Sequence, residues 1–297
     1  MVCAQRLGLQ PEGREVTHVA FSYQQSAISG RPVKTKTKTN RLYDKSAIEA
    51  FLRRSPFLHL YALGDLDDRF WPATTWYGRI EAGEIRAVAL LYGGLGLPTL
   101  LALGGEEMPH LEELLRSILP LLPRRFYTHL SPGLAGILGH HYRLEPHGEH
   151  DKMALVHLDR LPFTEIPGVV RLTEADLEEV LQFYAGSYPG NWFEPQMLQS
   201  GPYFGMRGPG GLVSIAGVHV WSPRYRVAAL GNVATHPGQR GRGYGRAVTG
   251  TLCTHLLCTA DTIGLNVKSD NAAAIACYRA LGFEPCACYE EYLAERR

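Results

Sequence analysis

The residues best suited to chemistry lie in one glycine- and arginine-rich segment, Leu230-Gly-Asn-Val-Ala-Thr-His-Pro-Gly-Gln-Arg-Gly-Arg-Gly-Tyr-Gly-Arg246. An apolar, strand-like stretch leads into it and a helical pattern follows, so its glycines fall in the turn that opens a helix. Backbone N–H groups at such a turn have no intrahelical acceptor, and glycines let an anion approach them closely. These glycines are Gly241, Gly243 and Gly245. The segment is therefore suited to holding phosphate.

Three arginines add positive charge to this turn, with no carboxylate between them: Arg240, Arg242 and Arg246. Such a cluster suits a diphosphate better than a single carboxylate. Two familiar nucleotide loops do not fit. A Walker loop requires Lys-Ser/Thr where this chain has Tyr244-Gly245, and a dinucleotide fingerprint requires a third glycine where it has Val248. The sequence therefore predicts a diphosphate ligand outside these two nucleotide classes.

A second segment follows the loop, Asn271-Ala-Ala-Ala-Ile-Ala-Cys-Tyr278-Arg-Ala-Leu-Gly282-Phe283, with a strand-like stretch at 262–267 between them. This segment and Arg240-Gly-Arg-Gly243-Tyr-Gly245 resemble, in order and separation, the two signatures of the GNAT superfamily of acyl-CoA-dependent N-acyltransferases. The resemblance implies acetyl-CoA as cosubstrate and no metal. It covers 169–297 at the level of motifs and 46–158 only in topology, because Gly104-Gly105 stands at the loop position without Arg-x-x-Gly-x-Gly.

The resemblance also implies roles for individual residues. The loop would grip the coenzyme A pyrophosphate through Arg240, Gly241, Arg242, Gly243, Tyr244, Gly245 and Arg246. The strand before it, at Val233, Ala234 and Thr235, would bind the pantetheine arm and polarise the thioester through backbone N–H groups. Asn271 would lie beside the coenzyme, and Tyr278 would donate a proton to the thiolate. Tyr278 also shares an apolar helical face with Ile275 and Leu281, so a role in the core competes with the acid role.

The base that takes the proton of the attacking amine is less evident. Many relatives carry a carboxylate early on the strand before the loop, but Ala229 stands there in this chain. His219, on the preceding strand, could accept a proton directly or through water, because an unperturbed imidazole titrates near pH 6.5. A structural role for this histidine is the alternative. Asn232 could orient a water molecule, and His236 is expected outside the reacting centre.

The acceptor site is expected along 186–211, a stretch rich in glycine, proline and aromatic residues that reads as a long surface segment. The predicted acceptor residues are Tyr188, Trp192, Phe193, Glu194 and Tyr203, with Tyr184 and Phe204 as further aromatic lining. Glu194 is the nearby carboxylate available to an ammonium group. Packing of these aromatic side chains between the two halves of the chain is an equally open interpretation.

Helix- and strand-like patterns recur in the same order in both halves. In the first half, a capping-box pattern at Ser46-Ala-Ile-Glu49 opens a helix. The elements that follow are a hairpin at 76–80 and 85–92, strands at 97–103, 126–130 and 153–158, and helices at 108–122 and 132–140. In the second half, Thr173-Glu-Ala-Asp176 opens a helix, followed by strands at 212–221, 227–235 and 262–267 and helices at 242–258 and 272–281.

The repeated order predicts an α/β (α+β) fold of tandem GNAT-like domains, each a mixed, mostly antiparallel central sheet flanked by helices. We place a poorly defined extension at 1–41, a degenerate GNAT-like domain at 42–160 and a GNAT N-acetyltransferase domain at 167–297. The extension ends in alternating Lys and Thr, including Lys34, Lys36 and Lys38. A solvated tail, a strand edge and a weak polyanion contact are all open readings of that pattern.

Net charge, cysteine content and the length of apolar runs limit the kinds of partner and compartment that we expect. The 297 residues include 30 Lys and Arg against 29 Asp and Glu, for a formal net charge of +1, which argues against a dedicated polyanion binder. Six cysteines without a CxxC pair indicate a reducing cytoplasm and no disulfide scaffold. No apolar run approaches the roughly 18–20 residues that span a bilayer. We therefore expect a cytoplasmic monomer or homodimer that binds acetyl-CoA and an amine acceptor, without membrane or nucleic-acid partners.

Three function classes follow. The leading hypothesis is an acetyl-CoA-dependent N-acetyltransferase that acts on a primary amine, of a small molecule or a protein, by direct attack in a ternary complex. The absent carboxylate at Ala229 and the degenerate first half leave a catalytically silent acyl-CoA-binding or regulatory module as the alternative. Nucleic-acid binding through the lysines of the extension and the arginine loop is the third class.

Overall fold

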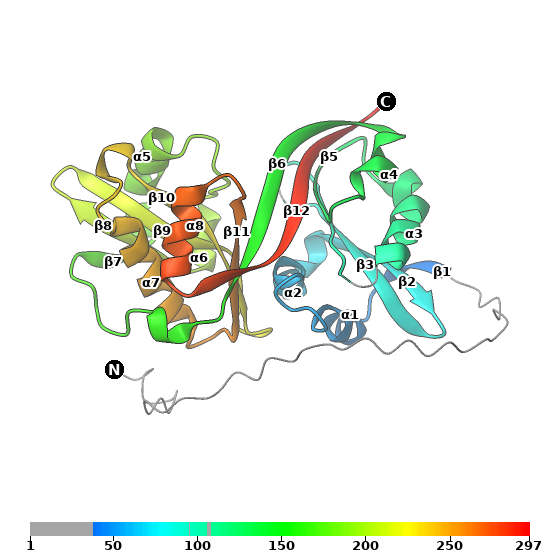
Figure 1. Cartoon of the computed structure of the whole chain (residues 1–297), viewed down its shortest axis with the longest axis horizontal. Coiled ribbons are helices and arrows are strands. Elements are labelled where there is room, and N and C mark those ends of the chain that lie inside the picture. The colour runs from blue at the N-terminus through cyan, green and yellow to red at the C-terminus, as the bar shows by residue number, and fades with distance from the viewer. Residues whose placement is uncertain (1–37, 95, 106–107) are drawn as a thin grey trace. The chain divides into compact units, whose positions relative to one another are not determined.

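Twelve strands among the residues that the structure describes form one continuous sheet (Figure 1). The structure is a computed structural model that describes residues 38–94, 96–105 and 108–297, and these residues form one compact unit. Most of the predicted extension, with Lys34, Lys36 and the side chain of Lys38, lies outside the described residues.

The predicted elements occur in the predicted order. The structure adds strands at Lys38–Leu42, Val169–Leu172 and Tyr203–Gly208 and helices at Leu60–Asp65 and Gln196–Ser200, which the sequence analysis did not predict. The first half contributes β1 (Lys38–Leu42), α1 (Lys45–Leu52), α2 (Leu60–Asp65), β2 (Thr74–Glu81), β3 (Glu84–Tyr92), β4 (Thr99–Ala102), α3 (Met108–Ile118), β5 (Arg125–Leu130), α4 (Ala135–Gly139) and β6 (Tyr142–Leu155). The second half contributes β7 (Val169–Leu172), α5 (Leu177–Ser187), α6 (Gln196–Ser200), β8 (Tyr203–Gly208), β9 (Gly211–Ser222), β10 (Val227–Thr235), α7 (Tyr244–Leu256), β11 (Thr262–Lys268), α8 (Ala272–Ala280) and β12 (Phe283–Arg296).

The two halves repeat one topology. In the first half β2, β3 and β4 pair antiparallel and β4 pairs parallel with β5. In the second half β8, β9 and β10 pair antiparallel and β10 pairs parallel with β11. The mixed, mostly antiparallel fold predicted from the repeated element order is thus confirmed.

The halves are joined by exchange of their last strands. The strand order is β1-β2-β3-β4-β5-β12-β6-β11-β10-β9-β8-β7. The last strand of the first half, β6, pairs with β11, and the last strand of the second half, β12, pairs with β5. The two exchanged strands also pair with each other along their whole length, from Phe283↔Leu155 to Arg296↔Tyr142, and Figure 1 shows them crossing between the halves. Each half therefore completes the sheet of the other.

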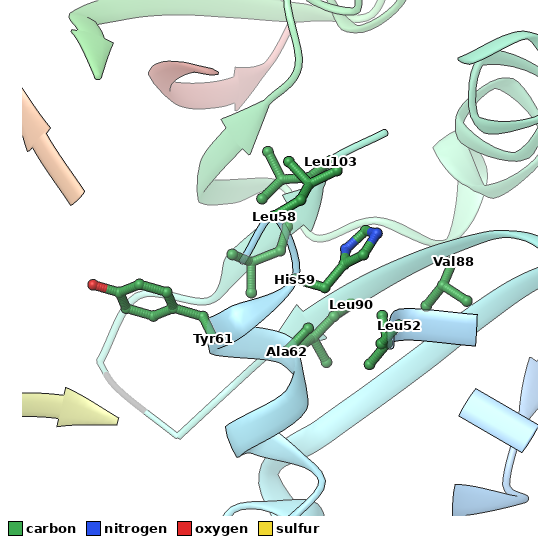
Figure 2. Close-up of a pocket in the computed structure, with 9 residues that line it drawn as sticks. Leu52, Leu58, His59, Tyr61, Ala62, Val88, Leu90 and Leu103 are labelled. Carbon is green, nitrogen blue, oxygen red and sulfur yellow. The ribbon is translucent and has the colours of Figure 1, made fainter. Parts of the chain in front are cut away.

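Helix α2 belongs to the first half in sequence but packs against strands β9, β10 and β11 of the second half. Its Leu60 and Leu63 share one buried cluster with Val220, Val227 and Ala229. Beneath α2 the first half has a pocket of about 10 Å³, which has room for no group larger than a water molecule (Figure 2). The two halves thus share a core in which α2 is the bridging element.

Three local predictions need correction. Asp44 rather than Ser46 caps α1, because its carboxylate accepts hydrogen bonds from the N–H groups of Ser46 and Ala47, at 2.9 and 3.1 Å. Strand β6 begins at Tyr142 instead of 153, since pairing with β12 supports an exposed, polar middle that has no apolar alternation. The predicted surface segment 186–211 contains α6 and the whole of strand β8, which is largely buried. The capping box of Thr173 and Asp176 is confirmed.

We expect Gly64→Ala to destabilise the protein by about 1–3 kcal/mol through overpacking. A Cβ atom at Gly64 in α2 would lie 1.9 Å from Cγ1 of Val220 on β9, and valine has few rotamers with which to yield. Urea unfolding measures the change. Gly136→Ala is the matched control, because Gly136 is also helical but has open space around it, so alanine should stabilise α4 by about 0.5–1 kcal/mol. Equal stabilisation by both substitutions would contradict tight packing of α2 on β9.

Candidate active site

The site begins where β10 and β11 separate. These parallel strands pair from Val227↔Thr262 to Leu230↔Leu265 and no further within the described sheet. Beyond that point β10 continues to Thr235, still paired on its other edge with β9, while β11 continues to Lys268 beside β6. The edge of β10 at Val233, Ala234 and Thr235 is thus left open to a ligand, on the residues predicted to bind pantetheine.

Two β-bulges lie at this separation. His219 is the extra residue in β9, between the pairs Ala229↔Val220 and Leu230↔Val218. A second irregularity, between Gly231 and Ala234 of β10, leaves Asn232 in a left-handed conformation with φ of 54°. Bulges redirect side chains, and the ring of His219 lies across Gly231, where a Cβ atom would come within 2.3 Å of it. The imidazole is thereby held beside the opening between β10 and β11.

Asn232 stabilises the bulge and is not free to orient water. Its side chain is buried and donates a hydrogen bond to the hydroxyl of Tyr203 at 3.0 Å. Its backbone carbonyl accepts a hydrogen bond from the hydroxyl of Tyr184 at 2.6 Å. Tyr203 in turn donates to the carbonyl of Val218 at 3.1 Å. This network connects the two bulged strands, β9 and β10, to helix α5 and strand β8.

His219 has the properties of a proton acceptor. Burial lowers its pKa, and the neighbouring Asn232 and the carboxylate of Glu291 act in the opposite direction without cancelling the shift. The imidazole is therefore neutral at pH 7. Its Nε2 atom is buried and has no hydrogen-bond partner in the described part of the chain. Ala229, at the position where the family resemblance implies a carboxylate, is fully buried in the shared core beneath α2.

Tyr278 lies in the core, with a hydroxyl that could serve the predicted acid role. Its ring is 7% exposed and packs in the core of the second half, with its centroid 5.9 Å from that of Phe283. Burial raises the pKa of its hydroxyl, which therefore stays protonated and can donate a proton at neutral pH. No hydrogen bond to any described residue occupies that hydroxyl. Asn271, exposed at the start of the same helix, caps α8 by accepting from the N–H of Ala274 at 3.2 Å.

The glycine- and arginine-rich loop is open to solvent at the start of α7. Gly241 and Gly243 have φ of 76° and 82°, which other residues rarely adopt, and both face open space. Gly245 lets the helix approach β10, since a Cβ atom would lie 3.1 Å from Oγ1 of Thr235. The arginines are exposed and, within the described residues, form no ion pair with a carboxylate: Arg240, Arg242 and Arg246. His236 accepts from the N–H of Gly238 at 3.2 Å and so stabilises the turn.

The predicted acceptor residues divide into two groups. Tyr188 and Trp192 are 44% and 48% exposed, and Glu194 is also exposed. Phe193 packs between Tyr184 and the fully buried Tyr203, with ring centroids 5.1 and 5.6 Å away. Phe204 turns to the other side of the sheet, toward His255 of α7. Of the five predicted residues, Tyr188, Trp192 and Glu194 are thus exposed, whereas Phe193 and Tyr203 pack against other aromatic side chains.

Sequence reasoning missed two residues that the fold brings to this centre. The ring of Tyr61, from α2, lies 6.5 Å from that of His219. The carboxylate of Glu291, from β12, is close enough to raise the pKa of both His219 and Tyr188. Neither residue belongs to a motif, and each reaches the site only through contacts between the halves. No local sequence signal could have found them.

The described residues hold no group of three or more His, Cys, Asp or Glu side chains arranged for a metal ion. Cys286 and Cys288, the CxC pair, are both exposed free thiols. None of the described helices is long and apolar enough to cross a membrane.

Comparison with known proteins identifies part of the chain. A sequence model of the acetyltransferase (GNAT) family matches residues 169–283. This segment is a GNAT domain. It contains His219, Asn271, Tyr278 and the whole arginine loop, whereas Tyr61 and Glu291 lie outside it. Members of the family are acyltransferases that use acetyl-CoA as cosubstrate.

Two curated relatives match over parts of their length. An uncharacterised protein of Mycobacterium leprae (strain TN) is 35% identical over 124 residues, which are 38% of this chain and 33% of that protein. A mycothiol acetyltransferase of Kocuria rhizophila is 30% identical over 141 residues, or 45% of this chain and 43% of that enzyme. The matches thus span less than half of each relative.

The tandem GNAT fold is shared with a solved structure. A tandem GNAT protein from the clavulanic acid biosynthesis pathway superposes with a TM-score of 0.51 and 16% identity, over 88% of this chain and 98% of that one. This likeness shows the fold, including the GNAT-like arrangement of the first half.

We expect the imidazole of His219 in the GNAT domain to titrate below pH 6.5, because burial disfavours its charged form more than its neighbours favour it. The groups that face it are Tyr61 of α2, Asn232 of β10 and the carboxylate of Glu291 of β12. A pH titration followed by ¹H–¹⁵N correlation NMR measures the midpoint, with His219→Gln identifying the signal. A midpoint above 6.5 would contradict the geometry described above.

Proposed function

We propose that the protein is an acetyl-CoA-dependent N-acetyltransferase that transfers an acetyl group to a primary amine. The observation that carries the proposal is the juxtaposition of the open edge of β10 with a neutral histidine, His219, on the facing bulge of β9. The open edge leads directly into an anion-binding loop. This combination supplies a place for the thioester arm, a place for the diphosphate and a proton acceptor between them.

Acetyl-CoA fits the residues present. The open, left-handed glycines of the loop leave room for the pyrophosphate against the first N–H groups of α7, and three unpaired arginines balance its charge. The free edge of β10 can pair with the amide groups of pantetheine as a further strand would. Its N–H groups at Val233 and Thr235 can polarise the thioester carbonyl. Asn271, besides capping α8, keeps its exposed amide toward solvent on the same helix as Tyr278.

The transfer then proceeds by direct attack. The neutral amine forms a bond from nitrogen to the acetyl carbonyl carbon, and the bond from that carbon to sulfur breaks. The amine proton passes to Nε2 of His219, directly or through water, and the hydroxyl of Tyr278 protonates the departing thiolate. Exchange with solvent then removes the added proton from His219 and reprotonates Tyr278. The products are an amide and a free thiol. A cysteine nucleophile is unsuited to the task, because burial raises the pKa of the Cys253 and Cys277 thiols.

The second candidate function is an acyl-CoA-binding module without turnover. The specific observation in its favour is Ala229, which leaves β10 without the carboxylate that would activate an amine. Binding of acetyl-CoA by calorimetry, combined with absence of thiol release across a panel of primary amines, would support this function over the enzyme.

We expect Tyr278→Phe to lower kcat roughly 100-fold and to leave the Kd for acetyl-CoA within about twofold, because general acid catalysis typically contributes 10²–10⁴-fold. Release of free thiol with an amine panel measures the rate. Tyr43→Phe serves as the control, since Tyr43 is 73% exposed in the first half. Full activity of Tyr278→Phe would assign this residue to the core alone.

We expect Arg240→Ala to weaken acetyl-CoA binding roughly 10- to 100-fold, because a charge-assisted hydrogen bond to phosphate would be lost. Isothermal titration calorimetry measures the affinity. Arg116→Ala is the control, as Arg116 is exposed on α3 and pairs with Glu112. Unchanged affinity of Arg240→Ala would show that the diphosphate binds elsewhere.

A further inference from the structure

A second polar centre lies where the exchanged strand β12 passes between β5 and β6. The carboxylate of Glu291 accepts hydrogen bonds from the hydroxyl of Tyr289, at 2.8 Å, and from that of Tyr127. Two imidazole nitrogens approach it, Nε2 of His129 at 3.4 Å and Nε2 of His150 at 3.6 Å. We call these residues, Tyr127, His129, His150, Tyr289 and Glu291, the Glu291 cluster. The Glu291 side chain is only 12% exposed.

The Glu291 cluster carries a negative charge at pH 7. Burial lowers the pKa of His129 to about 4 and also lowers that of His150, so both imidazoles are neutral. Burial alone would raise the pKa of Glu291, but His129, His150 and the two tyrosine hydroxyls outweigh it and leave the pKa lowered. Glu291 is therefore an ionised carboxylate, and the tyrosine hydroxyls and imidazoles that approach it are neutral.

No cation of the described chain neutralises this carboxylate directly. Neither a lysine nor an arginine among the described residues forms an ion pair with Glu291, and the buried Lys152 has other partners. Its ammonium donates to Oδ1 of Asn266 at 3.1 Å and lies over the rings of Tyr61 and Tyr289, at 5.1 and 5.2 Å. Burial lowers the pKa of Lys152 to about 8, so its ammonium stays mostly protonated at pH 7, and the charge of Glu291 acts to raise that pKa across the intervening distance. No lysine or arginine of the described chain contacts the carboxylate itself, and because buried charges are normally paired, the contact position can accept a cation from outside.

Tyr61 connects the Glu291 cluster to the reaction centre. Figure 2 shows its side chain directed away from the residues of the apolar pocket beneath α2. Its ring lies near that of His219. Burial raises the pKa of its hydroxyl, and the next contributions come from Glu291 and then Tyr278. Tyr61 thus stands within electrostatic reach of the cluster and of the predicted acid.

Exposed residues of the predicted acceptor segment, 186–211, also lie near the Glu291 cluster. The ring of Trp192 lies 5.8 Å from that of Tyr127, whose hydroxyl donates to Glu291. Tyr188, also exposed, has its pKa raised first by burial and then by the charge of Glu291. Aromatic faces and a carboxylate therefore adjoin on the side where the acceptor was expected, a combination suited to an organic cation.

We propose that Glu291 is the subsite for a second cationic group of the acceptor, one that does not react. The acceptor would thus be a primary amine that also carries a permanently charged ammonium group. The inference rests on the proposed function, because it assigns part of the same acceptor site. It separates two tasks: the ionised carboxylate holds the cation, and neutral His219 takes the proton of the reacting amine. Glu291 comes from β12 and Tyr127 from β5, so this subsite exists only because the strands are exchanged.

The test compares two probes that differ in one charge. (ω-Aminoalkyl)trimethylammonium ions with three, four and five methylenes are paired with the amines in which carbon replaces the quaternary nitrogen. Calorimetry with acetyl-CoA-free protein measures affinity, so the result does not depend on turnover. At neutral pH the primary amine of both probes is protonated, so the trimethylammonium probe is a dication and its isostere a monocation. We expect the full chain to bind at least one dicationic probe 10-fold or more tightly than its monocationic isostere. In Glu291→Gln this preference should fall to about twofold or less, while binding of the monocationic isostere is retained.

Glu295→Gln is the matched control, because Glu295 also lies on β12 but is 50% exposed and pairs with Arg143. Its preference for the dicationic probe should equal that of the unchanged protein. Equal affinities for each pair in the unchanged protein, undetectable binding of all dicationic probes, or an intact preference in Glu291→Gln would each overturn the inference. If the preference holds but no amine is acetylated, the subsite stands and the enzymatic function fails.

Discussion

The pairing of β6 with β12 is the interaction on which the rest of the structure depends. Strands β5 and β11 each end a parallel pair and would otherwise expose a free edge, which is a liability in isolated sheets. The exchange covers both edges at once, because β12 pairs with β5 and β6 pairs with β11. Neither half therefore has a complete sheet of its own, and the hydrogen bonds that close one half are supplied by the other.

This dependence makes the candidate site a product of both halves. In the proposed site, the GNAT domain supplies the glycine- and arginine-rich loop, the open edge of β10, His219 and Tyr278. The first half supplies Tyr61 through α2 and Tyr127 through β5, and the exchanged strand supplies Glu291. Under this proposal, a first half that lacks a coenzyme loop contributes shape and charge to the acceptor side of the site.

The features predicted correctly from the sequence are those that short local patterns specify. Glycine spacing placed the loop, alternation placed β9 and β10, and the capping box of Thr173 placed the start of the helix before the acceptor segment. The sequence could not place elements whose stability is non-local. The polar middle of β6, from Glu145 to Glu149, is a strand only because β12 lies beside it. Likewise, nothing in the sequence around Tyr61 or Glu291 indicates that the two share a site, since the chain must first fold to bring them together.

The packing of α2 also accounts for the carboxylate that the sequence lacks. Ala229 lies in the core shared with Leu60 and Leu63 of α2, and its surface is completely buried. A carboxyl group at that position would be buried among apolar side chains, which would raise its pKa and keep it protonated, as burial does for Asp65 of α2. Docking of the first half on β10 thus disfavours a carboxylate base at 229. The bulge in β9 offers a different solution, because it turns the neutral imidazole of His219 over Gly231 toward the opening between β10 and β11. The helix that buries Ala229 also places Tyr61 beside that imidazole, so the burial of Ala229 and the position of Tyr61 follow from a single packing arrangement.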